Sequence, residues 1–353
     1  MVKKLALIPA FETFIADTIK GKRRLSSGRK ISEGTISQYQ IVLLYLIEFE
    51  RSCNYPLRFL IGIKTSQRTF SAERNYWLKL RRKLELFLQE AHKCLDAYIA
   101  AVFKTIRTFI NYTRGEKGLN ILVFNKVFNA PSYTYRQVIL DNQQLRILAN
   151  NHSLLDKLSP KLEKSLDMFL VGCVIGLRFS DLIHLQTGSI KKFDERFYVE
   201  LTTVKTGNSV VIPLPAFAIE IIQRQPAQKS NCIFRPISMS NFNQHLKQIM
   251  EMAGYIADTP KFRHNKGKLV EIRTKAGNRF RLCDHFSSHS MRRIAITSLL
   301  TMGVPELVVR KISGHAPGSK EFYRYVILAQ AYSNQEIAMA QEKLYGSPTN
   351  PET

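Results

Sequence analysis

The stretch SSHSMRRIAIT, residues 287–297, combines basic, polar and apolar residues at helical spacing. His289 and Arg292 stand three positions apart, so on a helix they share one face. Ser287 or Ser288 can cap such a helix, and the positive potential of a helix N-terminus favours a bound anion. We therefore expect a helix that presents an imidazole and a guanidinium to a negatively charged group.

The overall charge points to the same kind of partner. The chain has 353 residues, enough for two domains, and its 52 Lys and Arg residues against 28 Asp and Glu give a net charge of +24. That excess predicts a polyanion, most often nucleic acid, with a membrane surface as the competing interpretation. No apolar run reaches the roughly 18 residues that a transmembrane helix needs. The five cysteines lie far apart without metal-binding spacing, which predicts reduced thiols, no bound metal and a cytoplasmic location.

A domain boundary is expected near NAPSYTYRQ (129–137), whose composition is typical of a linker. The first domain, residues 1–136, shows helical periodicity over 36–51 and again over 74–113, where two or more helices fit. It holds 24 Lys and Arg against 10 Asp and Glu. Its basic loop GKRRLSSGRK (21–30) is either a solvated charge run or a phosphate contact. We expect contact with phosphate groups of the polyanion through Lys22, Arg23 and Arg24.

The second domain, residues 137–353, mixes helical and strand patterns. Helical periodicity covers 140–150, 162–176, 240–254 and most of 288–344. The segment 197–215 predicts two strands joined at Thr-Gly-Asn, with Pro213 closing the second. A further strand-like stretch, 268–282, has a turn at Ala-Gly-Asn. The expected fold is mainly α with a small antiparallel β-sheet: a helical N-terminal domain followed by a mixed α/β domain.

Three more short segments of the second domain carry candidate residues. IGLRFSD (175–181) places Arg178 after a Gly-Leu turn and Asp181 three residues later, where a carboxylate can orient the arginine. Lys205 stands at the tip of the predicted hairpin, where a lysine is more often a solvated charge. GHAPGSKEFYRYV (314–326) holds His315 and two tyrosines. Each segment alone fits a structural role, but their order and spacing form a pattern.

In that order and spacing the chain resembles the tyrosine recombinase, or phage integrase, family. The family pattern is an Arg in a Gly-Leu-Arg-x-x-Glu/Asp setting, a Lys on a β-hairpin, His-x-x-Arg, Leu/Ser-Gly-His, and a Tyr about nine residues beyond that last His. Here IGLRFSD, VKTGNSVVIPL, HSMR and SGH follow one another between residues 175 and 315. The resemblance covers roughly residues 138–345. The basic helical region before it resembles the family's core-binding domain in character only.

The resemblance implies a role for each residue. Arg178 and Arg292 would donate paired hydrogen bonds to the non-bridging oxygens of a DNA phosphate, and Asp181 would support Arg178. Lys205 would be the general acid for the leaving 5′-oxygen. His289 would be the base or a phosphate donor, and His315 a further phosphate donor. Arg293 is a further DNA-binding candidate. Because the arginines supply the positive charge, no metal or other cofactor is expected.

The nucleophile is the point at which the chain departs from the pattern. Nine residues after His315 stands Arg324, with Tyr323 and Tyr325 on either side. The two tyrosines would diverge by about 200° on a helix, so both cannot face one phosphate. Family members often carry an aromatic or apolar residue three before the tyrosine, and Phe322 holds that place for Tyr325. We therefore expect Tyr325 to be the nucleophile.

The resemblance implies a site-specific DNA recombinase or integrase, located in the cytoplasm at the nucleoid. Integration of a mobile element, DNA inversion and chromosome-dimer resolution all fit the sequence. It would cleave double-stranded DNA through a 3′-phosphotyrosyl link and exchange strands through a Holliday junction, as a homo-tetramer on DNA. The segment 334–346 has apolar residues near helical spacing. It would dock on a neighbouring protomer or pack on its own domain. The alternatives are a type IB topoisomerase-like enzyme and a DNA-binding protein without catalytic activity.

Overall fold

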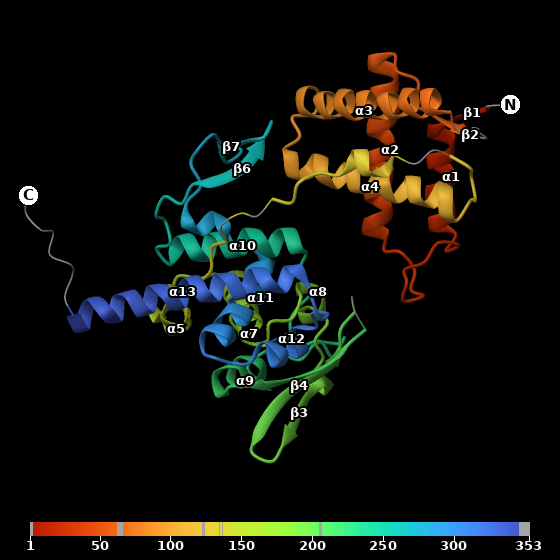
Figure 1. The fold of residues 1–353 in the computed structure, drawn as a ribbon. Coiled ribbons are helices and arrows are strands. Elements are labelled where there is room, and N and C mark those ends of the chain that lie inside the picture. Colours follow the sequence, from red (N-terminus) through yellow and green to blue (C-terminus); the bar gives the residue numbers. More distant parts are fainter. Residues whose placement is uncertain are drawn as a thin grey trace, which may run out of the picture. The chain divides into compact units, whose positions relative to one another are not determined.

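The computed structural model describes residues 3–61, 66–121, 124–133, 135, 137–204 and 207–345. The chain forms two compact units (Figure 1). Unit 1 comprises residues 1–135 together with 261–272, and unit 2 comprises residues 136–260 and 273–353. Both are rich in helices and contain only small antiparallel sheets, which confirms the fold class expected from the sequence.

Within its described residues, unit 1 is built around four long helices. They are α1 (Leu7–Ile19), α2 (Glu33–Cys53), α3 (Gln67–Glu90) and α4 (Asp96–Gly115), with a short 3-10 helix η1 (Asn125–Phe128). Ser32 and Ser66 begin α2 and α3 by accepting hydrogen bonds from backbone N–H groups three residues on. Strands β1 (Lys3–Ala6) and β2 (Arg58–Ile61) pair antiparallel. The core is unusually aromatic, with fully buried side chains at Phe11, Phe14, Phe49, Phe59, Trp77, Phe103, Phe109 and Phe128.

A hairpin from the second half of the sequence completes unit 1. Strands β6 (Lys261–Asn265) and β7 (Lys268–Ile272) turn at Lys266 and Gly267, which both have positive φ as a tight two-residue turn requires. The carboxylate of Asp96, at the start of α4, accepts hydrogen bonds from the N–H groups of Lys266 (2.9 Å) and Gly267 (2.8 Å). The turn expected at Ala-Gly-Asn is present at Gly277. The strand expected after that turn does not form, because η3 follows β7 with no strand between them.

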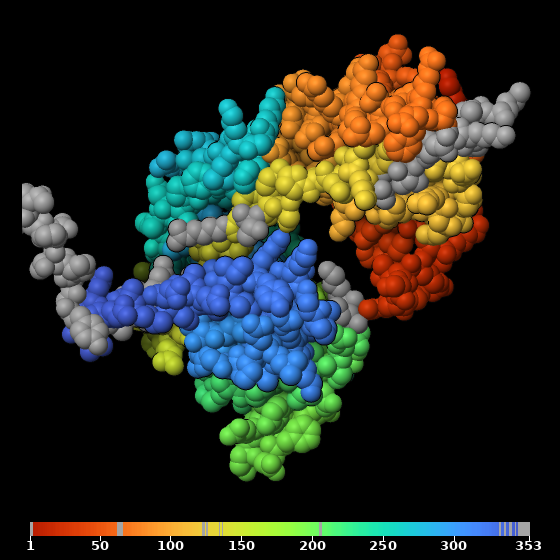
Figure 2. Space-filling model, in the orientation of Figure 1, coloured from red at the N-terminus to blue at the C-terminus, as the bar shows by residue number. Residues whose placement is uncertain are grey.

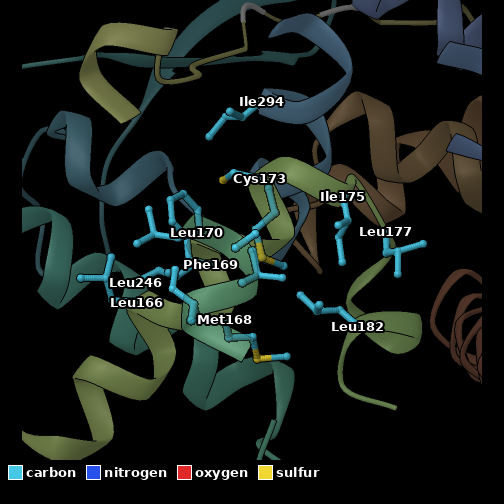
Figure 3. Close-up of a cluster of buried hydrophobic side chains, with 14 of the residues drawn as sticks. Leu166, Met168, Phe169, Leu170, Cys173, Ile175, Leu177, Leu182, Leu246 and Ile294 are labelled. Carbon is cyan, nitrogen blue, oxygen red and sulfur yellow. The ribbon is translucent and has the colours of Figure 1, made fainter. Parts of the chain in front are cut away.

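Unit 2 packs its helices around α7 (Pro160–Ile175), which is buried on every side from Ser165 to Cys173. Figure 3 shows Leu170 and Cys173 of α7 beside Leu246 of α10 and Ile294 of α11. The other described helices of this unit are α5 (Asn142–Ala149), α6 (His152–Leu155), α8 (Phe179–Leu182), η2 (Thr187–Ser189), α9 (Ala216–Gln223), α10 (Met239–Met252), η3 (Leu282–His285), α11 (Ser288–Thr301), α12 (Glu306–Ser313) and α13 (Lys320–Tyr345).

One glycine allows α7 and α11 to come close together. A Cβ added at Gly172 would overlap the Sδ of Met291 and lie 3.0 Å from a methyl group of Leu182. The close packing of α7 against α11 therefore depends on glycine at position 172. Figure 2 shows α13, in dark blue, as a continuous ridge on one face of unit 2.

The sheet of unit 2 has the order β3 (Ile190–Phe193), β4 (Arg196–Thr202), β5 (Ser209–Leu214), all antiparallel. Pro213 was expected to close the second strand, and β5 ends one residue later, at Leu214; Pro213 itself lies opposite Tyr198. Strand β5 is an edge strand, so a residue without an N–H group can be accommodated there. The β4–β5 hairpin matches the pair of strands expected over 197–215.

Candidate active site

Unit 2 contains a cavity of about 750 Å³ at which several of the candidate residues meet. Its wall comes from the start of α8, from α11, from the loop after α12 and from α13. It includes the candidates Arg178, His289, Arg292, Arg293, His315 and Tyr325. The structure thus brings together residues that lie up to 147 positions apart in the sequence.

Arg292 lies at the back of this cavity, on α11. The helix begins with a capping box, in which the N–H of Ser287 donates to the Oγ of Ser290 (3.0 Å). The guanidinium is 3% exposed; its Nη1 donates to the carbonyl of Gly176 (3.0 Å) and its Nη2 to that of Ser313. Burial and the neighbouring charge of Arg178 lower the pKa of Arg292 to about 10, so it stays charged at neutral pH.

Arg178 enters the cavity from the N-terminus of α8. Gly176 ends α7 in the left-handed region (φ 63°), and this turn leads the chain to Arg178. The Nη1 of Arg178 is buried and has no hydrogen-bond partner among the described residues. Arg178 also lines the cavity, so binding an anion there would not cost this N–H group a protein contact.

Asp181 has a different neighbour from the expected one. Its Oδ1 accepts a hydrogen bond from the N–H of Val204 (2.8 Å), and its buried Oδ2 has no partner in the part of the chain that the structure describes. No hydrogen bond or ion pair between Asp181 and Arg178 occurs there either. Asp181 therefore ties α8 to the end of strand β4.

Lys205 lies outside the described residues, so its position relative to the cavity stays a prediction. The chain on both sides of it is described. The N–H of Thr203 donates to the carbonyl of Asn208 (2.9 Å), and Val204 is held by Asp181 as above. The two ends of the connection that carries Lys205 are thus joined to each other and to α8.

Tyr323 and Tyr325, which stand two positions apart on α13, lie in different surroundings. Tyr325 is 7% exposed, lines the cavity and has its ring centroid 5.7 Å from that of His315. Phe322, one turn earlier, is fully buried in the same apolar cluster as Tyr325. Tyr323 is 49% exposed and lies under the guanidinium of Arg310 at 5.1 Å. Only Tyr325 of this pair lines the cavity.

The two histidines differ in their exposure. His289 is exposed on the first turn of α11, at the rim of the cavity, with Arg293 one turn later. His315 is partly buried, directly after α12. Burial and the charges of Arg292 and Arg178 lower the pKa of His315 to about 4. The imidazole of His315 is therefore neutral at pH 7 in the free protein.

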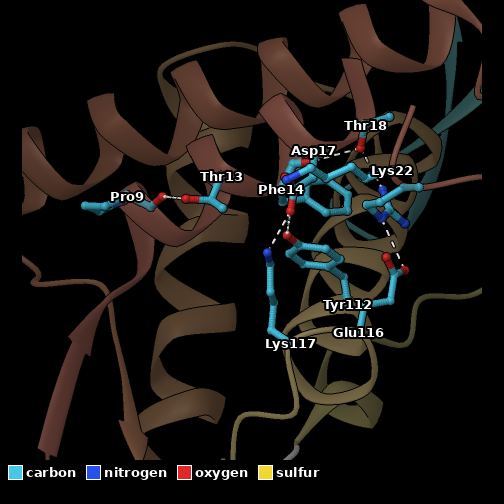
Figure 4. A network of polar contacts seen from close by, with 10 residues as sticks. Pro9, Thr13, Phe14, Asp17, Thr18, Lys22, Tyr112, Glu116 and Lys117 are labelled. Atoms are coloured by element: carbon cyan, nitrogen blue, oxygen red, sulfur yellow. Dashed lines mark hydrogen bonds and ion pairs between the residues drawn. The ribbon is translucent and has the colours of Figure 1, made fainter. Parts of the chain in front are cut away.

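Of the three candidate DNA-binding residues in the basic loop 21–30, Arg23 contacts other side chains within unit 1. Arg23 is 9% exposed; its guanidinium lies over the ring of Phe14 (4.2 Å) and donates to Thr18 Oγ1 (2.9 Å) and Glu116 Oε1 (3.3 Å). Figure 4 shows this network, in which Asp17 accepts hydrogen bonds from Tyr112 and Lys117.

Lys22 and Arg24 remain exposed on the same loop. Lys22 pairs with Asp17 at 3.5 Å, and Arg24 donates to the carbonyl of Gly28 (3.0 Å). The structure therefore leaves Lys22 and Arg24, rather than Arg23, at the surface where a phosphate could reach them.

Two residues at the site were overlooked in the sequence. Gly176 and Ser313 supply the carbonyls that hold Arg292, and Ser313 also contacts His315 through its side chain. Both residues are inside the segments quoted above, IGLRFSD and SGH. No feature of their residue type indicates these contacts, because a backbone carbonyl is common to every residue.

Among the described residues, no group of three or more His, Cys, Asp or Glu side chains is arranged to hold a metal ion. The same residues include no helix with both the length and the apolar character needed to cross a membrane. The cavity instead offers guanidinium and imidazole groups, a donor set that suits a phosphate.

Three solved structures with similar folds are DNA complexes of recombinases or integrases. A complex of the XerH site-specific recombinase with a palindromic difH substrate after cleavage is 12% identical, with a TM-score of 0.57, over 96% of this chain and 89% of that one. The Tn1549 transposon integrase with circular intermediate DNA is 13% identical (TM-score 0.54; 91% and 95%). A lambda integrase dimer bound to a COC′ core site is 12% identical (TM-score 0.51; 91% and 95%). At these identities the likeness is one of fold.

A search of curated proteins finds no match. The family model described as the phage integrase family matches residues 137–330, which is more than half of the chain and includes the whole cavity wall from Arg178 to Tyr325. This match confirms the resemblance seen in the four sequence segments. The chain therefore belongs to the phage integrase family.

Proposed function

We propose that this protein is a site-specific DNA recombinase that cleaves and rejoins duplex DNA by transesterification. The phenol oxygen of Tyr325 attacks a phosphodiester, forms a 3′-phosphotyrosyl bond and releases a 5′-hydroxyl. A 5′-hydroxyl of a second duplex then attacks that bond and releases the tyrosine. Each step exchanges one phosphoester for another, so no external energy source is required.

The observation that carries the proposal is the shared cavity of Tyr325 and two arginines. Attack on a phosphodiester builds charge on the non-bridging oxygens of the pentacoordinate state. Arg178, whose Nη1 has no partner among the described residues, and the buried Arg292 line the same cavity and can stabilise that charge. A nucleophile and fixed cationic donors around one cavity are what this reaction needs.

The protons of the reaction need an acceptor and a donor. The phenol must lose a proton before it attacks, and His289, at the rim, is proposed as the base or as a donor to the phosphate. The leaving 5′-oxygen must gain a proton, and Lys205 is proposed as its donor. The contact between Asp181 and Val204 supports this second role, because it joins the Lys205 connection to the helix that follows Arg178.

The assembly follows from the number of strands. Exchange between two duplexes breaks four strands, one per tyrosine, so a complete reaction requires four protomers and passes through a Holliday junction. The net charge of +24 supports double-stranded DNA as the partner. The structure of the Tn1549 transposon integrase is a complex with circular intermediate DNA. We propose that this chain likewise serves a mobile element, in the cytoplasm at the nucleoid.

The test is the formation of a covalent protein–DNA adduct. A binding site is first selected from a randomised duplex library, and a duplex carrying that site with a nick beside the cleaved bond then traps the intermediate. We expect an adduct that survives denaturation with the wild type and with Tyr323→Phe, and none with Tyr325→Phe. Specific binding without any adduct would favour a non-catalytic DNA-binding protein. Cleavage by a monomer with relaxation of supercoils would favour the topoisomerase-like alternative.

A further inference from the structure

Ser313 is the last residue of α12 and is 3% exposed. Its backbone carbonyl accepts a hydrogen bond from Arg292, as described above. Its hydroxyl lies 2.6 Å from the carbonyl oxygen of Val309 and 2.8 Å from the Nδ1 of His315. One buried residue thus contacts both an arginine and a histidine of the cavity.

The proton on the Ser313 hydroxyl can be placed by elimination. A carbonyl oxygen has no proton to donate, so the short contact with Val309 is a hydrogen bond only if the hydroxyl donates it. Its single proton is then used, and toward His315 the oxygen can only accept. The Nδ1 of His315 must therefore carry the imidazole proton and donate it to Ser313.

The second nitrogen of the ring is left without its own proton. In a neutral imidazole only one nitrogen is protonated, so Nε2 has a lone pair. The Nη2 of Arg292 lies 3.3 Å from Nδ1 and 3.4 Å from Nε2. Since Nδ1 already carries a proton, Nη2 can donate only toward Nε2, which accepts in this tautomer. Nε2 is therefore an acceptor at a cavity that the guanidiniums of Arg178 and Arg292 also line.

We propose that Ser313 is a positioning residue of the active site, which fixes His315 in the tautomer with its proton on Nδ1 and an acceptor at Nε2. This inference rests on the proposed function in one respect: the anion that His315 meets is the DNA phosphate. In this tautomer neutral His315 cannot donate to a phosphate. It becomes a donor only after it takes up a proton from solvent on Nε2, and it keeps that proton through the attack.

The charges around His315 set the direction of this uptake. They are the guanidiniums of Arg292, Arg178 and Arg310 and the carboxylate of Glu321. The neutral phenol ring of Tyr325 also lies against the imidazole. In the free protein the arginines and burial lower the pKa of His315 to about 4, which favours the neutral form. A bound phosphate is negative and raises that pKa. Protonation, and the donation that depends on it, is therefore lost as pH rises through the pKa of the DNA complex.

Removing the hydroxyl gives a distinctive result. In Ser313→Ala the Nδ1 proton has no acceptor, so the neutral ring can carry its proton on Nε2 and donate without uptake. The wild-type rate of adduct formation should fall about tenfold per pH unit above the pKa of the complex, as one proton dictates. The Ser313→Ala rate should be flat over the same range. Ser313→Thr retains a hydroxyl and should keep the wild-type profile.

The tautomer itself is tested without any catalysis. In the full-length protein with ¹⁵N-labelled histidine, long-range ¹H–¹⁵N correlation spectra distinguish the protonated from the unprotonated ring nitrogen. The chain has eight histidines, and the signals missing from His315→Asn identify those of His315. At pH 7 we expect a protonated Nδ1 in the wild type and in Ser313→Thr, and a protonated Nε2 in Ser313→Ala.

A protonated Nε2 in the wild type would overturn the proposal, whatever the variants do. So would a pH profile that Ser313→Ala leaves unchanged. The expected spectra in a protein that forms no adduct on any DNA would uphold the tautomer assigned to Ser313 and reject the proposed recombinase chemistry instead. A failure of the tautomer assignment is therefore distinguishable from a failure of the proposed recombinase function.

Discussion

Replacing Arg178 or Arg292 by alanine should slow cleavage equally but affect stability unequally. In the proposed mechanism both guanidiniums stabilise the charge of the transition state. Loss of one such donor costs about 2.7–4 kcal/mol, so Arg178→Ala and Arg292→Ala should each slow single-turnover adduct formation by about 10²–10³. Lysine should restore little at either position, because a point charge does not replace a paired donor.

The difference in stability follows from the hydrogen bonds of each arginine. Removal of Arg292 leaves the carbonyls of Gly176 and Ser313 without this donor inside the fold. Each unsatisfied buried acceptor costs about 1–3 kcal/mol, a loss of at least about 2 kcal/mol in the free energy of unfolding. For a unit of this size that lowers Tm by about 4–8 °C. Arg178 has a buried Nη1 without a partner in the described structure, so Arg178→Ala should leave Tm nearly unchanged.

The assays are quench-flow measurement of the adduct at saturating DNA and calorimetry of the full-length protein without DNA. Two outcomes would refute the reasoning. A Tm that falls equally in both variants would mean that Arg178 contributes as much as Arg292 to the stability of the fold. Near-normal cleavage with lysine at both positions would mean that charge alone, and not paired donation, stabilises the phosphate.

Three other predictions address the metal, the packing and the DNA-binding loop. Adduct formation should persist in excess EDTA, because the arginines supply the positive charge; a strict need for magnesium in the cleavage step would contradict the mechanism. Gly172→Ala should lower Tm in calorimetry, since the added Cβ meets Met291 and overpacking costs about 1–3 kcal/mol, whereas Gly188→Ala, which meets nothing within 4 Å, should not. Lys22→Gln combined with Arg24→Gln should reduce the slope of log affinity against log salt by up to about two units in binding titrations, because each DNA phosphate that is no longer neutralised lowers it by about 0.9. An unchanged slope would move the DNA-binding surface of unit 1 away from this loop.

Helices with a clear apolar face were predictable because their burial is one-sided. The periodicity over 36–51 and 240–254 corresponds to α2 and α10, whose buried residues recur at helical spacing. The β6–β7 hairpin was misplaced by several residues for a tertiary reason. Its turn is held by the carboxylate of Asp96, which is distant in sequence, so the local pattern favoured the Ala-Gly-Asn turn instead.

The family resemblance pointed to residues that line the cavity, but it did not indicate their contacts. The place of Phe322 three residues before Tyr325 led to the tyrosine that lines the cavity, because one buried helix face carries both side chains. Asp181 was assigned to the nearest cation in sequence, yet its partner is the backbone N–H of Val204, just after β4. Arg23 was assigned to DNA with its neighbours, yet it lies over Phe14. In both cases the partner is brought in by folding and leaves no mark on the local sequence.

The most direct test of the account is to locate the phosphotyrosyl bond. Trypsin cuts after Lys320, Arg324 and Lys343, so it places Tyr323 in the peptide 321–324 and Tyr325 in the peptide 325–343. The trapped adduct is digested with trypsin and nuclease, and mass spectrometry with fragmentation then identifies the tyrosine that carries the residual nucleotide. The account predicts the modification on Tyr325. A nucleotide on Tyr323, or on any residue outside the cavity, would contradict it.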